Sequence, residues 1–520
     1  MNDLSSVTAE TLEQMQPAMR ESLARATTTG FTTALGAQGF ELEAPAKFLV
    51  PVLSPFRNRI ARRMAQIGSL NANWKAITGI NVGNANPFVA FGVAGTVVQT
   101  TLSVYQAAYV PLALGDTVQM DAQVLAKGFD DLRARSGTNL LFALMIAEDR
   151  MLLGGESFAL QTPGTPTVAT ATTGGTIALS TAVNFVVAAR NIEGYYLNLS
   201  LANGTGAGAV AGGGTVTSAN GTVTTGGGTS TNTATASVAS VAGAVAYDWY
   251  AGATNAAYYF IGTTTTNVSP ILTALPGADA TNPSVAAPQV SPARSGGGLN
   301  VRTAFVDTSA DANAFNGLLA SMAGDVNAAG AYVPRGTGTS SGASFTSLDN
   351  AVLTGIGGTI VQIDAALIAL FNNFRISPTR MLMNAQQHLD ASNKMVATGA
   401  YNTFLQGVDL ENRQVMAGGI FMTKYINKAA NGMPIIMETQ PNLPPGTIIL
   451  ITEVLPYPNN EVNSVFEVET QMEYTQIEYA MSRTTGNLGG PRYDLEVRAI
   501  EVFKNYFPAG CAAISNIAAG

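Results

Sequence analysis

The strongest hydrophobic pattern in the chain lies in the stretch FDDLRARSGTNLLFALMIAEDRMLLGGES. Its apolar residues recur at helical spacing, at Leu140, Leu141, Leu144, Met145, Met151 and Leu152. Only Glu148 interrupts this stripe. Asp130 and Asp131 suit the positive end of a helix dipole, and Gly154 begins a glycine pair typical of a helix stop. The pattern therefore predicts a long helix over residues 129–153.

Further elements follow in the second half of the chain. GGTIVQIDAALIALFNNF predicts a helix whose apolar side carries Ile360, Ile363, Leu367, Phe371 and Phe374. RMLMN predicts a short buried strand, after which Asn384 is placed to cap the helix AQQHLDASNKM. PIIMET, TIILITEV and RYDLEVRAIEVFKNYF predict strands.

The stretch SVFEVETQMEY alternates strictly between apolar and polar residues. Three of its glutamates, Glu467, Glu469 and Glu473, could be considered for metal binding or acid–base chemistry. Side chains two residues apart on one strand lie roughly 7 Å apart, too far to share a metal without partners. The alternation explains them as the solvent-facing side of an antiparallel strand, and this is our interpretation.

The N-terminal region predicts a helix over residues 9–26, and the Pro-punctuated segment APAKFLVPVLSPFRNRIARRM comes later. That segment ends in an arginine cluster made of Arg57, Arg59, Arg62 and Arg63. We expect the cluster to form a solvated or subunit-contact face, with binding to nucleic acid as the alternative.

Residues 76–115 carry no charge and are rich in Val, Thr and Tyr with Gly and Pro breaks. This composition predicts the strands of a long hairpin. Nothing nearby in the sequence is long enough to cover it, so a partner subunit is the surface that could bury it.

A second charge-poor stretch runs from residue 158 to 292, where only Arg190, Glu193, Asp248 and Asp279 are charged. AVAYDWYAG and AAYYFIGTT predict strands of an immunoglobulin- or fibronectin-like β-sandwich, without a cysteine pair to support an antibody-like domain. Within the stretch, GGGTVTSANGTVTTGGG predicts a two-stranded hairpin that turns at Asn220. A flexible linker is the alternative to a folded module.

The composition of the chain limits the classes of function that it can have. The chain has 520 residues, of which 47% are hydrophobic and 12% charged, with a net charge of −8. The absence of a long apolar run or a secretory signal leads us to expect a protein that stays in the cytoplasm where it is made. A single cysteine, Cys511, and a single histidine, His388, exclude a disulfide framework and a His-rich metal site, and we expect both to be structural. No catalytic, cofactor-binding or metal-binding residue is predicted, and hence no enzyme.

Four stretches carry a resemblance to a known family, namely ALMIAEDRMLLGGES (143–157), FNGLL (315–319), SPTRMLMNAQQHLD (377–390) and YDLEVRAIEVFKNYFPAGCAAI (493–514). With the order of the predicted elements, the sequence resembles the major capsid proteins of tailed bacteriophages that have the Hong Kong 97-like fold. The resemblance covers all of the chain but the charge-poor stretch 158–292. It implies an α+β capsid fold with an inserted all-β sandwich.

The resemblance also implies a division into segments. These are an N-terminal arm (1–56), the arm end and extended loop (57–125), the spine helix of a peripheral domain (126–157), the inserted β-sandwich (158–297), more of the peripheral domain (298–378), an axial domain (379–490) and a returning strand with the tail (491–520).

The function implied is a coat protein that assembles into the icosahedral head of a tailed double-stranded DNA phage. The alternatives are an encapsulin-like compartment shell and a β-rich adhesin or glycan-binding protein. The implied partners are other copies in hexamers and pentamers, a portal protein at one vertex, a decoration protein and packaged DNA bound non-specifically, with no membrane. Its location would be the virion.

Two departures from the family matter. Some members link their subunits through a lysine of the extended loop, but no lysine lies between Ala76 and Ala126, so we expect a shell without covalent links. Members with a fused scaffold carry a longer charged N-terminal region, so we expect a separate scaffolding protein.

Overall fold

The structure is a computed structural model that describes residues 47–66, 68–80, 88–95, 97, 100–127, 130–157, 159–196, 213–226, 230–255, 257–276, 285–286, 307, 309–311, 313–323, 345–398, 422–457, 461–482 and 492–520. The chain forms two compact units, residues 1–50 with 125–131 and residues 51–124 with 132–520. In the first unit only residues 47–50, 125–127 and 130–131 are described, so the helix expected over residues 9–26 lies outside the description.

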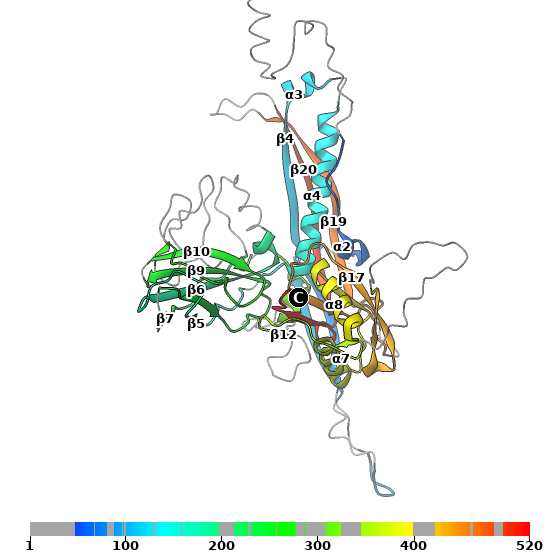
Figure 1. The fold of residues 1–520 in the computed structure, drawn as a ribbon. Helices are drawn as coiled ribbons and strands as arrows, with labels where there is room; N and C mark the ends of the chain where they lie inside the picture. The colour runs from blue at the N-terminus through cyan, green and yellow to red at the C-terminus, as the bar shows by residue number, and fades with distance from the viewer. Residues whose placement is uncertain are drawn as a thin grey trace, which may run out of the picture. The chain divides into compact units, whose positions relative to one another are not determined.

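A long helix lies along a four-stranded sheet in the second unit (Figure 1). The helix, α4 (Leu132–Gly154), is the one that the apolar stripe predicted. The sheet has the order β1-β19-β20-β4, from Ala61–Met64, Phe466–Ser482, Arg492–Asn505 and Val110–Gln119. Strand β1 runs parallel to β19, and the other neighbours are antiparallel. Leu140, Leu144 and Leu152 are buried, as expected for a stripe that packs on a sheet.

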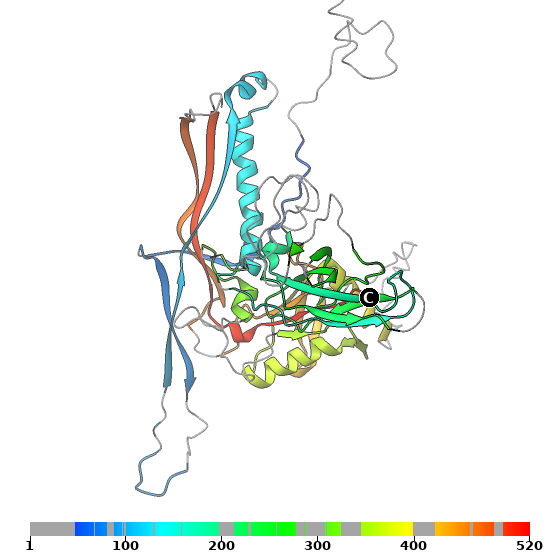
Figure 2. The same cartoon turned by 90° about the vertical axis from the view of Figure 1, so that its left-hand side faces the viewer.

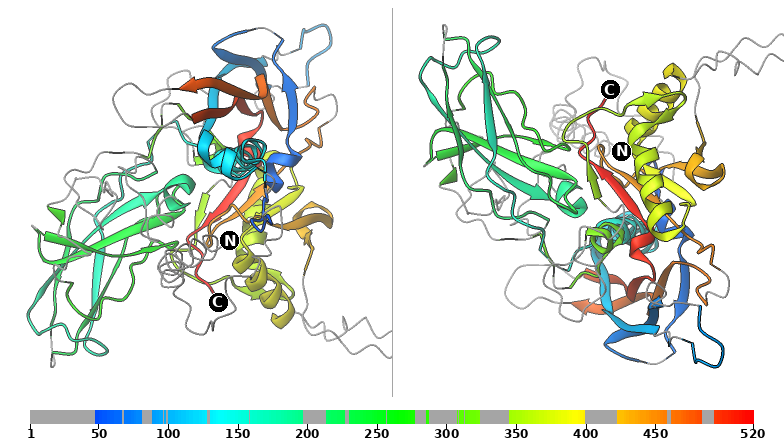
Figure 3. Two further views of the ribbon diagram at one scale, coloured as in Figure 1. Left: turned by 90° about the horizontal axis from the view of Figure 1, so that it is seen from above. Right: turned by 90° about the horizontal axis from the view of Figure 1, so that it is seen from below.

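A second sheet has six strands in the order β12-β21-β18-β15-β17-β16. In that order they span Phe345–Ser347, Ala512–Ser515, Ile448–Ile451, Arg380–Met383, Met433–Thr439 and Lys424–Asn427. Helices α7 (Val361–Phe374) and α8 (Ala385–Thr398) share one hydrophobic core with this sheet (Figure 3). Asn384 Oδ1 accepts a hydrogen bond from the amide of Gln386 at 3.1 Å, so the predicted cap of α8 is confirmed.

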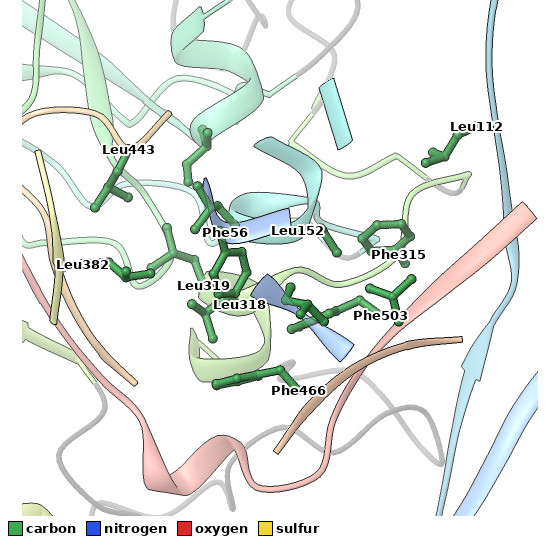
Figure 4. Close-up of a cluster of buried hydrophobic side chains, with 14 of the residues drawn as sticks. Phe56, Leu112, Leu152, Phe315, Leu318, Leu319, Leu382, Leu443, Phe466 and Phe503 are labelled. Carbon is green, nitrogen blue, oxygen red and sulfur yellow. The ribbon is translucent and has the colours of Figure 1, made fainter. Parts of the chain in front are cut away.

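Alternate residues of the six-stranded sheet face two different cores. Met381, Met383 and Ile448 pack with α7 and α8, whereas Leu382 and Ile449 belong to a second core. Figure 4 shows that second core, in which Phe56, Leu152, Leu319, Leu382 and Phe503 gather from distant parts of the chain. It joins the six-stranded sheet to α4, to helix α6 (Leu318–Ala323) and to the four-stranded sheet.

The expected boundary at residue 379 does not follow this packing. It separates α7 from β15, although both contribute to one core. The expected axial range 379–490 also supplies β19 to the four-stranded sheet, while β12 and β21, outside that range, belong to the six-stranded sheet. Long-range strand pairing, which hydrophobic periodicity does not report, sets these groupings.

A long hairpin is present as predicted, formed by β2 (Asn71–Ile80) and β3 (Thr100–Ala108), which pair antiparallel from Asn71↔Ala108 to Ile80↔Thr100. Its bounds differ from the predicted range 76–115, because β2 begins earlier and residues 110–115 belong to β4. Figure 2 shows them as an extended two-stranded ribbon drawn in blue. Helix α2 (Pro55–Arg59) precedes the hairpin, and helix α3 (Met120–Leu125) follows β4.

The charge-poor stretch folds into two β-sheets around a core of its own, as expected for a module and not for a linker. One sheet has the order β11-β10-β9-β6-β7, from Val285–Ala286, Ala257–Thr264, Ala246–Thr254, Ala182–Arg190 and Gly221–Thr224. The other pairs β5 (Thr167–Ala171) with β8 (Thr233–Ser237). Trp249 and Tyr247 are fully buried in the shared core.

Two of the four charges in this stretch neutralise each other inside the module. Arg190 Nη2 lies 2.6 Å from Asp248 Oδ2, and both side chains are buried. A buried pair of this kind leaves no uncompensated charge in the core. The pair joins the neighbouring inner strands β6 and β9 without adding a net charge to the interior of the module.

The prediction of a hairpin that turns at Asn220 is wrong. Residues 221–224 pair with β6 from Phe185↔Gly221 to Ala182↔Thr224, and Gly214 forms a bridge with Arg190 on the same strand. Both halves thus line one edge of β6. Side-chain hydroxyls explain this outcome, because Ser218 Oγ and Thr215 Oγ1 accept hydrogen bonds from β6 amides at 3.1 and 3.0 Å.

Among the described residues, no helix is both long enough and apolar enough to cross a membrane.

Candidate functional site: an apolar hairpin and its charged base

The hairpin exposes large apolar side chains beyond the ends of its paired strands. Phe88 and Phe91 are 85% and 109% exposed, and Val93 and Val97 are also exposed. On strand β3, Leu102 and Val104 add to the surface. Several large apolar side chains exposed on one element indicate an interaction site.

Aromatic contacts hold the base of the hairpin. The Trp74 ring lies 6.0 Å from the Tyr105 ring of the paired strand and 5.9 Å from the Tyr506 ring next to β20. Lys504 Nζ lies 5.7 Å from the Trp74 centroid, a cation–π geometry. The hairpin is therefore tied to the four-stranded sheet at its base while its far end stays exposed.

The arginine cluster binds carboxylates of its own chain. Arg57 and Arg62 contact Glu148, Arg62 also contacts Glu501 at 3.1 Å, and the partners of Arg59 and Arg63 are Glu438, Glu453, Glu467 and Glu469. A solvated face is wrong for Arg57, whose side chain is 13% exposed, but it holds for Arg63, whose side chain is 54% exposed. Subunit contact and nucleic-acid binding by this cluster stay predictions. Periodicity could not show these ion pairs, because most of the acidic partners lie hundreds of residues away in the sequence.

Glu148, the residue that interrupts the apolar stripe of α4, is the centre of this network. Its side chain is fully buried, and Arg57 Nε lies 2.5 Å from its Oε2. The adjacent Asp149 accepts hydrogen bonds from the Arg57 amide at 2.7 Å and from Asn442 Nδ2 at 2.6 Å. Burial raises the pKa of Asp149, and these hydrogen bonds oppose that rise. The two acids thus fasten α2 to the long helix.

Glu469 is a second correction to the sequence interpretation. It was expected on the wet side of β19, but its side chain is buried and contacts Lys504 and Arg63. Burial raises the pKa of Glu469, but the hydrogen bond and charge of Lys504 and Arg63 outweigh it, so the pKa lies below its ordinary value. Glu473 is exposed, as the alternation predicted, whereas Glu467 is half-buried and pairs with Arg63.

His388 and Cys511 are both buried, and their structural role stays a prediction. His388 lies on α8 with Nδ1 2.8 Å from Thr439 Oγ1 and Nε2 2.7 Å from the Met422 carbonyl oxygen, which fastens the helix to the end of β17. Cys511 is fully buried, and this burial raises the pKa of its thiol to about 12. No group of three or more His, Cys, Asp or Glu residues that could hold a metal occurs in the described part of the chain.

The C-terminal end of α4 is packed against the module. A Cβ atom at Gly154 would lie 2.6 Å from Ile192 Cδ1 and 2.7 Å from Ile192 Cβ. We expect Gly154→Ala to lower the free energy of unfolding by about 2 kcal/mol, because the clash includes the branched Cβ, which no rotamer change relieves. Chemical denaturation measures this, and an unchanged midpoint for Gly154→Ala would contradict the packing.

The chain is thus an α+β protein that joins a long helix, two mixed sheets and a β-rich module, and that presents an apolar hairpin on a charged and aromatic base. No model of a known protein family matches it, and no curated protein matches it.

The chain is similar to several solved structures from phages and a GTA particle. The cyanophage A-1(L) capsid is 10% identical with a TM-score of 0.45, covering 93% of this chain and 98% of that chain. The capsid of a native GTA particle is 8% identical with a TM-score of 0.40, covering 94% and 100%. The mycobacterium phage Ogopogo structure is 7% identical with a TM-score of 0.39, covering 94% and 99%.

Proposed function

We propose that this chain is the major capsid protein of a tailed double-stranded DNA phage, with the Hong Kong 97-like fold and an inserted immunoglobulin- or fibronectin-like module. The observation that carries the proposal is the hairpin of β2 and β3, whose apolar end is exposed while its base is fixed to the four-stranded sheet. Monomeric soluble proteins rarely expose large apolar side chains on an extended hairpin, because contact with water is unfavourable. In a shell, the neighbouring subunit would bury this surface.

The packing also supports a revised division into domains. The peripheral domain comprises α4 with the four-stranded sheet, and the axial domain comprises the six-stranded sheet with α7 and α8. The inserted module begins after residue 157 and its chain returns to α4 before α6, where the Gly317 amide donates to the Gly155 carbonyl at 2.7 Å. The arm is the segment that ends with α2 and β1.

The partners in this proposal are other copies of the chain in hexamers and pentamers, a portal protein, a scaffolding protein and packaged DNA. A decoration protein is a further partner, and the protein resides in the virion. Electron microscopy of the protein co-expressed with its scaffold tests the class: closed icosahedral shells support it. Shells that enclose cargo proteins and no DNA in infected cells would favour the encapsulin-like alternative, and fibres or soluble monomers would contradict both.

We expect the shell to be held without covalent links between subunits. Lys75 is the one lysine on the two hairpin strands, and residues 76–126 contain no lysine that could form an isopeptide bond. Boiling purified particles in SDS should therefore release a single band at the monomer mass on a gel. A ladder of linked species would show that another lysine forms the bond.

A further inference from the structure

Two buried glutamates meet where the arm segment joins the long helix. Glu148 on α4 and Glu501 on β20 have fully buried side chains, and one guanidinium, that of Arg62 on β1, contacts both. Glu501 Oε2 lies 3.1 Å from Arg62 Nη1. Two carboxylates held so close by one arginine repel each other if both are ionised.

The two glutamates are not equivalent. Glu148 receives donors from both Arg57 and Arg62, whereas Glu501 Oε1 is buried and receives a hydrogen bond from no residue that the structure describes. A buried anionic oxygen without a donor is unfavourable, so the proton belongs on Glu501. Burial, and then the charge of Glu148, raise the pKa of Glu501 to about 8.

Arg62 of β1 is the cation that contacts Glu501, and Glu148 of α4 is the acidic group beside it. The strand neighbours of Glu501 are uncharged, namely Thr470 on β19 and Val110 on β4. Arg57 of α2 contacts Glu148 and Asp149, and the Tyr474 ring of β19 lies beside both guanidinium groups. The side chains of Arg57 and Arg62 are 13% and 30% exposed, so water can hydrate their charges. The carboxylates of Glu148 and Glu501 are fully buried and have no contact with bulk water.

We propose that Glu148 and Glu501 form a proton-dependent latch that holds the arm segment, α2 with β1, against α4 and β20. With Glu501 protonated, Glu148 is the only ionised member of the pair and both arginines bind it. When Glu501 loses its proton, a second buried anion appears between α4 and β20, and the favoured response is to open the junction to water. The latch is a property of the subunit and does not depend on the proposed function.

The sign of the pH dependence follows from the raised pKa. The folded protein binds this proton at pH values where the unfolded chain, with an ordinary glutamate near 4.5, has already released it. The contribution of Glu501 to stability is therefore fully present below pH 4.5, falls as pH rises, and is lost above about pH 8.

Hydrogen exchange of the purified, full-length subunit tests the latch. Between pH 6 and pH 9 we expect the protection factors of amides 58–65, corrected for intrinsic base catalysis, to fall about tenfold or more, the equivalent of at least one pKa unit. In Glu501→Gln, which mimics the protonated acid, protection should stay within about twofold over the same range. Glu473→Gln, the same change at an exposed site on the neighbouring strand, should behave as wild type.

An equal fall in protection in wild type and Glu501→Gln would overturn the latch. If the variant folds poorly, infrared difference spectra of the wild type across the same range provide the second measurement. A protonated carboxyl band at pH 6 that disappears above pH 8 supports the proposal, and spectra without that band overturn it.

Discussion

Replacing both Phe88 and Phe91 with glutamate should abolish shell assembly while leaving the subunit folded. Both rings are exposed in the subunit, so the change costs the monomer little. In the proposed shell the same rings are buried against a neighbour, and a buried unpaired carboxylate there is strongly unfavourable. We expect particle yield, measured by sedimentation and negative-stain microscopy, to fall by about a hundredfold or more, because each lost aromatic anchor costs about 2 kcal/mol or more per interface.

The matched control is Ile271→Glu, which places the same charge at an exposed apolar position of the module. It should assemble with near-normal yield, and circular dichroism should show all variants folded. Normal shells from the double phenylalanine variant would mean that the hairpin end takes no part in assembly.

Replacing Glu148 with alanine should produce the largest loss of subunit stability among changes in the arginine cluster. Removing one partner of an ion pair costs about 3–5 kcal/mol when the charge left behind is fully buried. Because Arg57 and Arg62 are partly exposed and can be hydrated, we expect a loss of about 2–3 kcal/mol, measured by chemical denaturation of the isolated subunit.

Glu478→Ala is the control for this prediction. Glu478 on β19 forms an exposed ion pair with Arg133 on α4, the helix that also carries Glu148. Exposed pairs contribute about 1 kcal/mol or less. Equal losses in the two variants would show that the buried position of Glu148 has no special weight.

Local patterns were enough to predict most of the elements. The apolar stripe located α4, the alternation of SVFEVETQMEY and RYDLEVRAIEVFKNYF located β19 and β20, and Asn384 capped α8 as expected. These features depend on neighbours three or four residues away in a helix, or two in a strand, and sequence reports such neighbours directly.

The arrangement of the elements depends on distant partners, and there the predictions failed. Arg57 and Arg62 bind Glu148 and Glu501, and a cluster of arginines on its own is typical of a solvated surface. Glu469 sits at a polar position of the alternation yet is buried, because Lys504 on the next strand compensates its charge. The hairpin predicted at Asn220 does not form, because both of its halves pair with the edge of β6 and not with each other. The one signal that sequence offered for the junction was Glu148, an acid inside an apolar stripe.

A cryo-electron microscopy map of the assembled particle tests the central claim most directly. We expect hexamers and pentamers in an icosahedral shell, with β2 and β3 of each subunit lying across the adjacent subunit and Phe88 and Phe91 buried in that contact. A map in which the hairpin folds back on its own subunit, or particles without icosahedral order, would contradict the account.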